Sequence, residues 1–400
     1  MLLAAFYGAG NDTDAYFIGY NAVLLLSGTL AQGVEQAVVP FAAYWIAHGR
    51  GGAQRTIDHA ASRMSGAAAA VWLLGCPVVT LLAPTRLRWP VGIYLIWFLP
   101  LALCWAASGV YGGSLVSQRQ IATSTGSMLL RGLGAMGGLA FVRFGGLWTV
   151  AVGLGVGEAV RVLWLRRQLT KYLPDDAGVL TPDSRGLGRA VVAQTSAGAT
   201  LGVVPLVERL LATSLGTGAA SHLEYAVRLL VPPGVLFEGA LAPLLLARWS
   251  QDIAAHRRRP RSREVLKPVF GGVSLAACLS LAMIAFSPFY VRVMLLHGRF
   301  QSLDAVAVSS LLRILAVGFI ANVGSLLLER VYLAASRNRA LALLAVARAG
   351  VRLIVVLTLL RSGLVAFGVG FVVAEWLYLL GLLAFLHYGS AHVFRPSEGS

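Results

Sequence analysis

Residues 91–109 read VGIYLIWFLPLALCWAASG, a run without a single charged side chain. An α-helix needs about 20 mostly apolar residues to cross a bilayer, because each backbone amide must find its hydrogen-bond partner within the segment. Residues 66–83, 271–288 and 351–388 meet or approach that length. Only 12% of the 400 residues are charged, which excludes a soluble globular domain. The sequence therefore predicts an all-α, polytopic transmembrane helical bundle.

Polar breaks divide the apolar runs into about eleven helical spans. The expected spans are 14–48, 55–83, 89–117, 121–143, 146–169, 186–215, 219–250, 264–291, 303–335, 340–360 and 363–388. Residues 1–7 are apolar but too short to span, and are expected to be the end of a longer helix. The longest polar break in the first half, 170–185, contains PDDAG at 174–178. We expect it to be a linker between an N-terminal lobe, 1–169, and a C-terminal lobe, 186–390, with a tail at 391–400.

The formal net charge of +16 is concentrated in the breaks between spans, most densely in residues 257–263. Basic loops of membrane proteins stay on the cytoplasmic side, which predicts that 170–185, 257–263 and the C-terminal tail are cytoplasmic. The expected location is the inner (cytoplasmic) membrane, where such loops contact anionic lipids. This loop-by-loop distribution disfavours nucleic acid as a partner.

Two short patterns recur at nearly one offset. GAG at 8–10 recurs as GTG at 216–218, and GSL at 113–115, before Arg119, recurs as GSL at 324–326, before Arg330. Parallel repeats of this kind are common in transporters, so we expect a duplicated lobe in which 14–48 corresponds to 219–250.

Enzymatic and metal chemistry find no support in the sequence. Cys76, Cys104 and Cys278 are isolated in apolar segments, and the seven histidines form no metal-binding spacing. There is no GxSxG elbow and no phosphate-binding loop of the Walker type. No enzyme activity, metal or cofactor is predicted, and H⁺ or Na⁺ would be the coupling ion of a gradient-driven process.

Ionisable residues inside the spans are the candidates for function, because each costs roughly 2.5–3.5 kcal/mol at the bilayer centre unless it has a partner or a wet cavity. They are Asp14, Glu35, Arg131, Glu158, Arg161, Glu208, Arg209, Glu224, Arg228, Glu238, Arg348, Arg352 and Glu375. Glu224 and Arg228 are spaced i, i+4 and can pair on one helical face. Glu208 and Arg209 are adjacent, so their side chains are expected to point in different directions. Structural ion pairs or residues that reach the helix ends are the competing interpretation.

Three groups of motifs resemble one family in order and spacing over nearly the whole chain. They are FYGAG at 6–10 with TDAYF at 13–17; LGTG at 215–218 with EYAVRL at 224–229, GAL at 239–241 and WS at 249–250; and GRF at 298–300 with YLAASR at 332–337. The family is MurJ/MviN, within the multidrug/oligosaccharidyl-lipid/polysaccharide flippase superfamily. The resemblance implies two six-helix lobes in a V around a central cavity, and a polyprenyl-diphosphate-linked saccharide moved by alternating access.

The resemblance also implies a substrate site. Arg228 matches the family's eighth-helix arginine, which is thought to meet the diphosphate of the cargo, and a guanidinium can donate two parallel hydrogen bonds to phosphate oxygens. Two positions depart from the family: Ser27-Gly28 replaces its second-helix arginine pair, and Val227 replaces an Asp. These departures favour a lipid-linked glycan other than lipid II. The predicted substrate-binding residues are Arg228, Glu224, Glu208, Arg209, Asp14 and Glu35.

Two other functions remain open from the sequence. A cation-coupled exporter of small amphipathic molecules would use Glu35, Glu208 and Glu238 as ion sites. A non-transporting scaffold for envelope synthesis, with envelope-synthesis enzymes as partners, would account for the missing arginines.

Overall fold

A computed structural model of the chain describes residues 2–48, 52–173, 184–246, 248–249, 262–334 and 338–388. Nine helices in these residues are long and apolar enough to cross a membrane, and the same residues contain no β-strand. The all-α, polytopic fold class is therefore confirmed. Residues 257–261 and 391–400 lie outside the described residues, so the cytoplasmic location of these segments stays a prediction.

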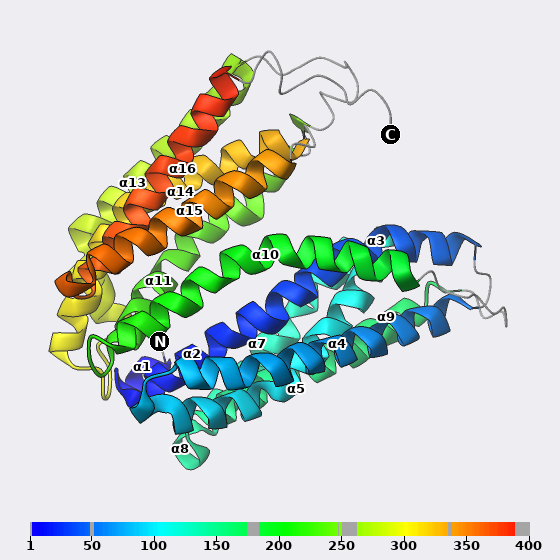
Figure 1. Ribbon diagram of the computed structural model, residues 1–400, viewed down its shortest axis with the longest axis horizontal. Coiled ribbons are helices and arrows are strands. Elements are labelled where there is room, and N and C mark those ends of the chain that lie inside the picture. The colour runs from blue at the N-terminus through cyan, green and yellow to red at the C-terminus, as the bar shows by residue number, and fades with distance from the viewer. Residues whose placement is uncertain are drawn as a thin grey trace. The chain divides into compact units, whose positions relative to one another are not determined.

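The chain forms two compact units, each described here by itself (Figure 1). The first unit is essentially residues 6–218 and the second is residues 219–400. The short helix α1 (Leu2–Tyr7) is shared between them. The division between these two units falls after Gly218. The linker expected at 170–185 lies mostly outside the described residues and stays a prediction. Helix α10 (Ser184–Thr213) belongs to the first unit because it packs against α2 and α3 there and buries Leu187 and Val191.

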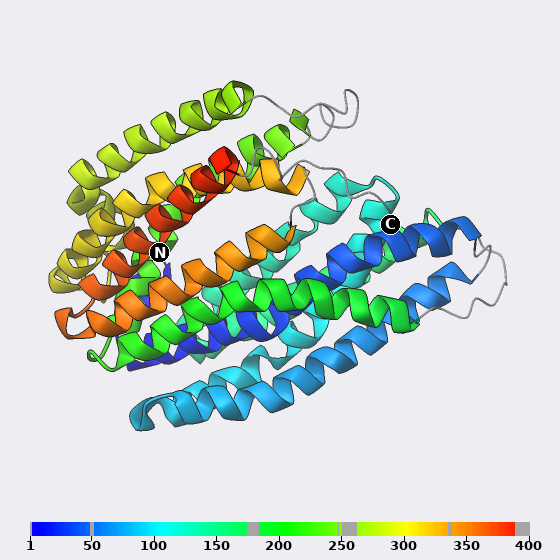
Figure 2. The same ribbon diagram turned by 45° about the horizontal axis from the view of Figure 1, so that its top comes forward.

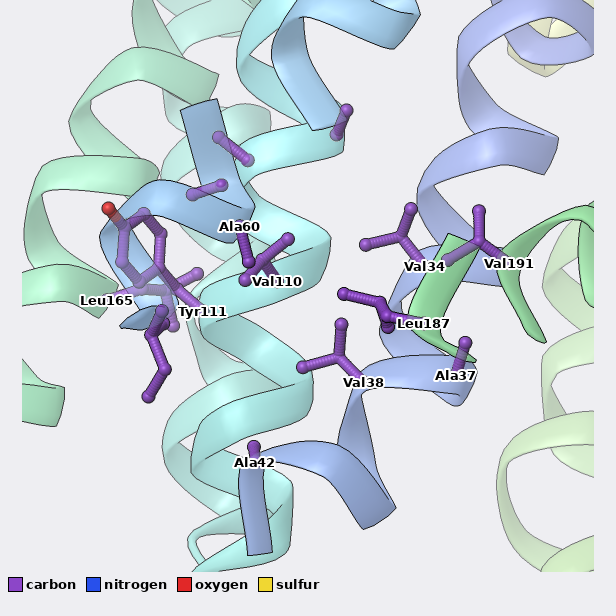
Figure 3. Packing of buried hydrophobic residues seen from close by; sticks show 14 of the residues in the cluster. Val34, Ala37, Val38, Ala42, Ala60, Val110, Tyr111, Leu165, Leu187 and Val191 are labelled. Carbon is purple, nitrogen blue, oxygen red and sulfur yellow. The ribbon is translucent and has the colours of Figure 1, made fainter. Parts of the chain in front are cut away.

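The remaining helices of the first unit are α2 (Asn11–Val23), α3 (Thr29–His48), α4 (Ala53–Leu82), α5 (Thr85–Ser117), α6 (Ile121–Gly126), α7 (Met128–Ala140), α8 (Val142–Gly145) and α9 (Trp148–Thr170). One core cluster of this unit is formed by side chains of α3, α4, α5, α9 and α10, some of which are drawn in Figure 3. Val34 and Val38 of α3 face Leu187 of α10, while Tyr111 of α5 packs with Leu165 of α9. Burial of these side chains fixes the helices that carry the charged residues described below.

The expected span 121–143 is broken into α6, α7 and α8. Gly134 and Gly138 of α7 face Gly153 and Gly157 of α9, each pair at the i, i+4 spacing that lets membrane helices pack backbone to backbone. A Cβ at Gly134 would lie 2.3 Å from the carbonyl oxygen of Gly153. The two helices are therefore joined by close backbone packing, which only glycine permits here.

The second unit contains α11 (Ala219–Leu236), α13 (Ser262–Leu295), α14 (Ser302–Ala334), α15 (Asn338–Thr358) and α16 (Val365–Tyr388). Helix α14 packs against α11, α13 and α16, and α15 packs mainly against α16 (Figures 1 and 2). His222 Nε2 of α11 lies 2.8 Å from Asp304 Oδ1 at the start of α14. The most buried helix of this unit is α14, with 67% of its most apolar window inside the protein.

Two long helices of the first unit recur in the second unit at one common offset, the repeat offset. It is the separation in sequence between the first residues of α5 and α14, Thr85 and Ser302, and both helices have 33 residues. The first residues of α9 and α16, Trp148 and Val365, have the same separation. The segments expected to correspond, 14–48 and 219–250, each contain one π-helical turn, Leu24–Gly28 and Phe237–Leu241. These regularities support the expected duplication.

Candidate functional site

Glu224 and Arg228 form the ion pair that their spacing predicts. Arg228 Nε donates to Glu224 Oε1 at 2.9 Å on one face of α11. The Glu224 side chain is buried, whereas 42% of the Arg228 side chain is exposed. A charged group at this depth is stable only where a carboxylate, water or an anion meets it. The exposed guanidinium can therefore donate to an incoming anion.

The helix that carries this pair changes its winding just after it. Pro232 and Pro233 lie inside α11 and supply no backbone N–H, and the π-helical turn Phe237–Leu241 follows directly. Glu238, an ion site in the exporter interpretation, is an exposed residue of this turn. Wide turns of this kind often occur near functional sites.

Glu208 and Arg209 lie on α10 in the first unit, and both are buried. Arg209 Nη1 lies 3.2 Å from Glu208 Oε2, so the expectation that these adjacent side chains point apart is wrong. The long arginine side chain turns back along the helix, where Nη1 is also 3.5 Å from the carbonyl oxygen of Pro205.

Asp14 and Glu35 also belong to the first unit, in different surroundings. Asp14 is fully buried on α2, and its Oδ2 accepts a hydrogen bond of 2.7 Å from the backbone N–H of Gly218. Gly218 has a φ of +83°, which is left-handed backbone that favours glycine. Asp14 therefore holds the end of the first unit. Glu35 is half-buried on α3, and its Oε1 lies beside Gly112 of α5.

The structure gathers further charges in the first unit that were considered singly in the sequence. Glu158 of α9 is fully buried and lies 2.5 Å from Arg131 Nε and 3.0 Å from Arg161 Nη1. The hydroxyl of Ser108 donates to Glu158, and Arg161 Nε donates to Ser127 Oγ at 2.8 Å. The Arg131 guanidinium lies over the Trp105 ring, 4.1 Å from its centroid. Glu35 is close enough to interact electrostatically with both arginines.

The second unit has a charged cluster of its own. Arg348 Nη2 of α15 lies 2.7 Å from Glu375 Oε1 of α16, and Asn322 Nδ2 of α14 donates to Glu375 Oε2 at 3.3 Å. The Tyr378 hydroxyl donates to Glu329 Oε1 at 2.9 Å. Sequence reasoning missed both clusters, because most of the partners lie on different helices; only Glu158 and Arg161, at i, i+3 on α9, could have been paired by spacing. The described parts of the chain hold no group of three or more His, Cys, Asp or Glu side chains that could bind a metal ion.

Comparison with known proteins decides the family. The family model described as "Lipid II flippase MurJ" matches residues 3–394. The chain belongs to this family. The expected family is therefore confirmed, and with it the class of multi-pass membrane transporters. No curated protein matches the chain by sequence.

Solved structures of several transporters share the fold. A lipid II flippase MurJ in an inward closed conformation matches with a TM-score of 0.81 and 16% identity, covering 96% of this chain and 83% of that one. An inward-facing multidrug resistance MATE family transporter matches at 0.77 and 14% identity, covering 98% and 93%. A MOP superfamily transporter from Pyrococcus furiosus Vc1 (DSM3638) matches at 0.70 and 13% identity, covering 96% and 89%. Identities this low establish the fold alone.

Proposed function

We propose that the chain is a flippase that moves a polyprenyl-diphosphate-linked saccharide across the cytoplasmic membrane by alternating access. The observation that carries this proposal is membership of the lipid II flippase family over residues 3–394. The cargo is a peptidoglycan precursor or another lipid-linked glycan. The chain supplies no catalytic site in this proposal, and its energy comes from an H⁺ or Na⁺ gradient, the membrane potential or consumption of the cargo.

The cargo's diphosphate is the group that Arg228 binds in this proposal. Glu224 holds the guanidinium when no cargo is present, and the diphosphate then accepts charge-assisted hydrogen bonds from the guanidinium in place of the carboxylate. Glu208, Arg209, Asp14 and Glu35 belong to the first unit and remain proposed substrate-binding residues of that unit. Asp14 has in addition the structural bond to Gly218.

The surroundings of Gly28 support a cargo other than lipid II. The family has an arginine pair near Ser27-Gly28, and a Cβ at Gly28 would already come within 3.1 Å of the Trp105 ring. The space for a long cationic side chain is therefore filled by an aromatic ring. A headgroup recognised with fewer arginines at this place fits the chain better.

Arg228→Ala tests the proposed anion site. We expect the rate of cargo flipping in reconstituted vesicles to fall by about tenfold or more, since one charged hydrogen-bonding group is lost. Arg228→Lys keeps the charge but loses the planar fork, so a partial defect is expected. Arg313→Ala is the matched control, because Arg313 is an exposed arginine of the same unit that donates to Ser287 Oγ, not to a carboxylate.

Normal flipping by Arg228→Ala would contradict this site. Export of lipophilic cations that is lost in Glu35→Gln or Glu208→Gln would support the cation-coupled exporter instead. A wild type that moves neither class of molecule would favour a scaffold that binds envelope-synthesis enzymes.

A further inference from the structure

The two units carry the same ion pair at the same place. Arg131 and Arg348 are separated by the repeat offset, the separation of α5 from α14, and so are Glu158 and Glu375. Both carboxylates are 0% exposed, and the arginines are 20% and 22% exposed. Arg131 Nε lies 2.5 Å from Glu158 Oε2, and Arg348 Nη2 lies 2.7 Å from Glu375 Oε1. Position, burial and geometry of the pair are therefore repeated together.

A third helix contacts the pair from equivalent positions in each unit. Trp105 of α5 lies over Arg131, while Asn322, at the equivalent position of α14 by the repeat offset, donates to Glu375. These positions keep their contact with the pair although the residue type differs, an aromatic ring in one unit and an amide in the other. Trp105 and Asn322 differ in residue type but contact the ion pair from equivalent positions. The two units therefore share the location of the pair, not the residue that contacts it.

A second carboxylate accompanies each pair, although it comes from different helices. In the second unit it is Glu329 of α14, bonded to Tyr378, whose ring lies 5.1 Å below the Arg348 guanidinium. The equivalent position in the first unit is Gly112, and a Cβ there would lie 3.4 Å from Glu35 Oε1 of α3. Glu35 thus places its carboxylate where the side chain of residue 112 would begin.

We propose that Arg131–Glu158 and Arg348–Glu375 are equivalent positioning pairs. Each fixes one pair of helices, α7–α9 or α15–α16, against the long helix α5 or α14. A buried ion pair adds little net stability compared with apolar side chains, because both charges lose their hydration. Its presence in membrane-spanning helices of both units therefore points to a role in fixing the orientation of these helices, because a hydrogen-bonded charge pair is directional. A transporter must preserve the arrangement of helices inside each unit while it moves.

The surroundings predict that loss of Arg131 alone is tolerated. Glu158 has a second guanidinium, Arg161 Nη1, at 3.0 Å, so Arg131→Gln leaves that carboxylate paired. We therefore expect Arg131→Gln to lower the thermal unfolding midpoint less than removal of Arg131 and Arg161 together.

Spin-label distances inside each unit test the proposal without any cargo. Label sites at Trp89 and Leu129 report α5 to α7, and the equivalent sites at Val306 and Val346 report α14 to α15; all four are exposed. Cys76, Cys104 and Cys278 are replaced by serine in the full-length protein. The pairs are removed as Arg131→Met with Glu158→Leu and Arg161→Met, and as Arg348→Met with Glu375→Leu, so that no charge of the pair is left alone.

We expect each replacement to broaden the distance distribution of its own unit and to leave that of the other unit unchanged. The exchanged pair, Arg348→Glu with Glu375→Arg, should give the second unit a distance distribution as narrow as that of the wild type. This variant replaces the apolar variant in the test if the apolar variant does not fold. Arg166→Gln is the control, because Arg166 pairs with Asp58 of another helix at 2.8 Å but its side chain is exposed. An unchanged distribution in either unit after the pair is removed would overturn the proposal.

A transport measurement shows whether the ion pairs position the helices for transport or only pack them together. Of the measurements on these pairs, this one alone rests on the proposed function. The apolar replacements should lower the maximal flipping rate by about tenfold while the half-saturating cargo concentration stays near that of the wild type. Normal flipping by both variants would mean that the pairs only pack. If the wild type does not flip the cargo, the proposed function fails, while the distance measurements still decide the role of the pairs.

Discussion

Single buried acceptors hold the first unit together, and Asp14 is the clearest example. Its carboxylate accepts the N–H of Gly218, and both residues are buried. Asp14→Ala would leave that N–H without its acceptor, so we expect a loss of about 1–3 kcal/mol in the free energy of unfolding. Asp14→Asn keeps an oxygen acceptor and should lose less. Thermal unfolding in detergent measures both, with Asp12→Ala, an exposed residue of the same turn, as a control that should lose at most about 1 kcal/mol.

What could be predicted at this scale depended on sequence separation. The Glu224–Arg228 pair follows from i, i+4 spacing and is present. The Glu208–Arg209 contact was not expected, because helix geometry separates adjacent Cβ atoms but does not limit how far a flexible arginine can turn back. The pairs Arg131–Glu158 and Arg348–Glu375 join different helices, so no local rule could find them. The signal available in the sequence was that both members of the pair recur at one common offset.

Among the elements, α7 and α9 depend on glycine to an unusual degree. A Cβ at Gly134 would lie 2.3 Å from the backbone of Gly153, whereas a Cβ at Gly137 would meet nothing within 4 Å. We expect Gly134→Ala to destabilise the protein by about 1–3 kcal/mol, because the two backbones must separate. Gly137→Ala, on another face of the same helix, should be neutral or stabilising by up to about 1 kcal/mol. Equal thermal midpoints for the two variants would contradict the close packing.

Helices were predicted best where their apolar runs were long. The run at 91–109 lies inside α5, and that at 351–388 corresponds to the end of α15 and to α16. The prediction of one helix over 121–143 was wrong, because the structure has three helices there, α6, α7 and α8. The glycines of this segment pack α7 closely against α9, a tertiary contact that the apolar run does not reveal. The π-helical turns could not be predicted, since no residue type requires one.

At the scale of the whole molecule, the duplication was predicted from two short motifs, and the family from motif order. The linker expected at 170–185 stays a prediction, since most of it lies outside the described residues. Helix α10 follows this polar break and packs with α2 and α3. A polar break marks the end of a span but does not say which helices the next span packs against.

The most direct measurement of the central claim is cargo flipping by the purified wild-type chain in lipid vesicles. A polyprenyl-diphosphate-linked saccharide with a fluorescent label is placed in both leaflets, and a membrane-impermeant reductant then bleaches the label that reaches the outer leaflet. Our account predicts bleaching of nearly all the label, faster than in vesicles with Arg228→Ala. Bleaching that stops at the outer-leaflet fraction, as in vesicles without protein, would contradict the proposed flippase.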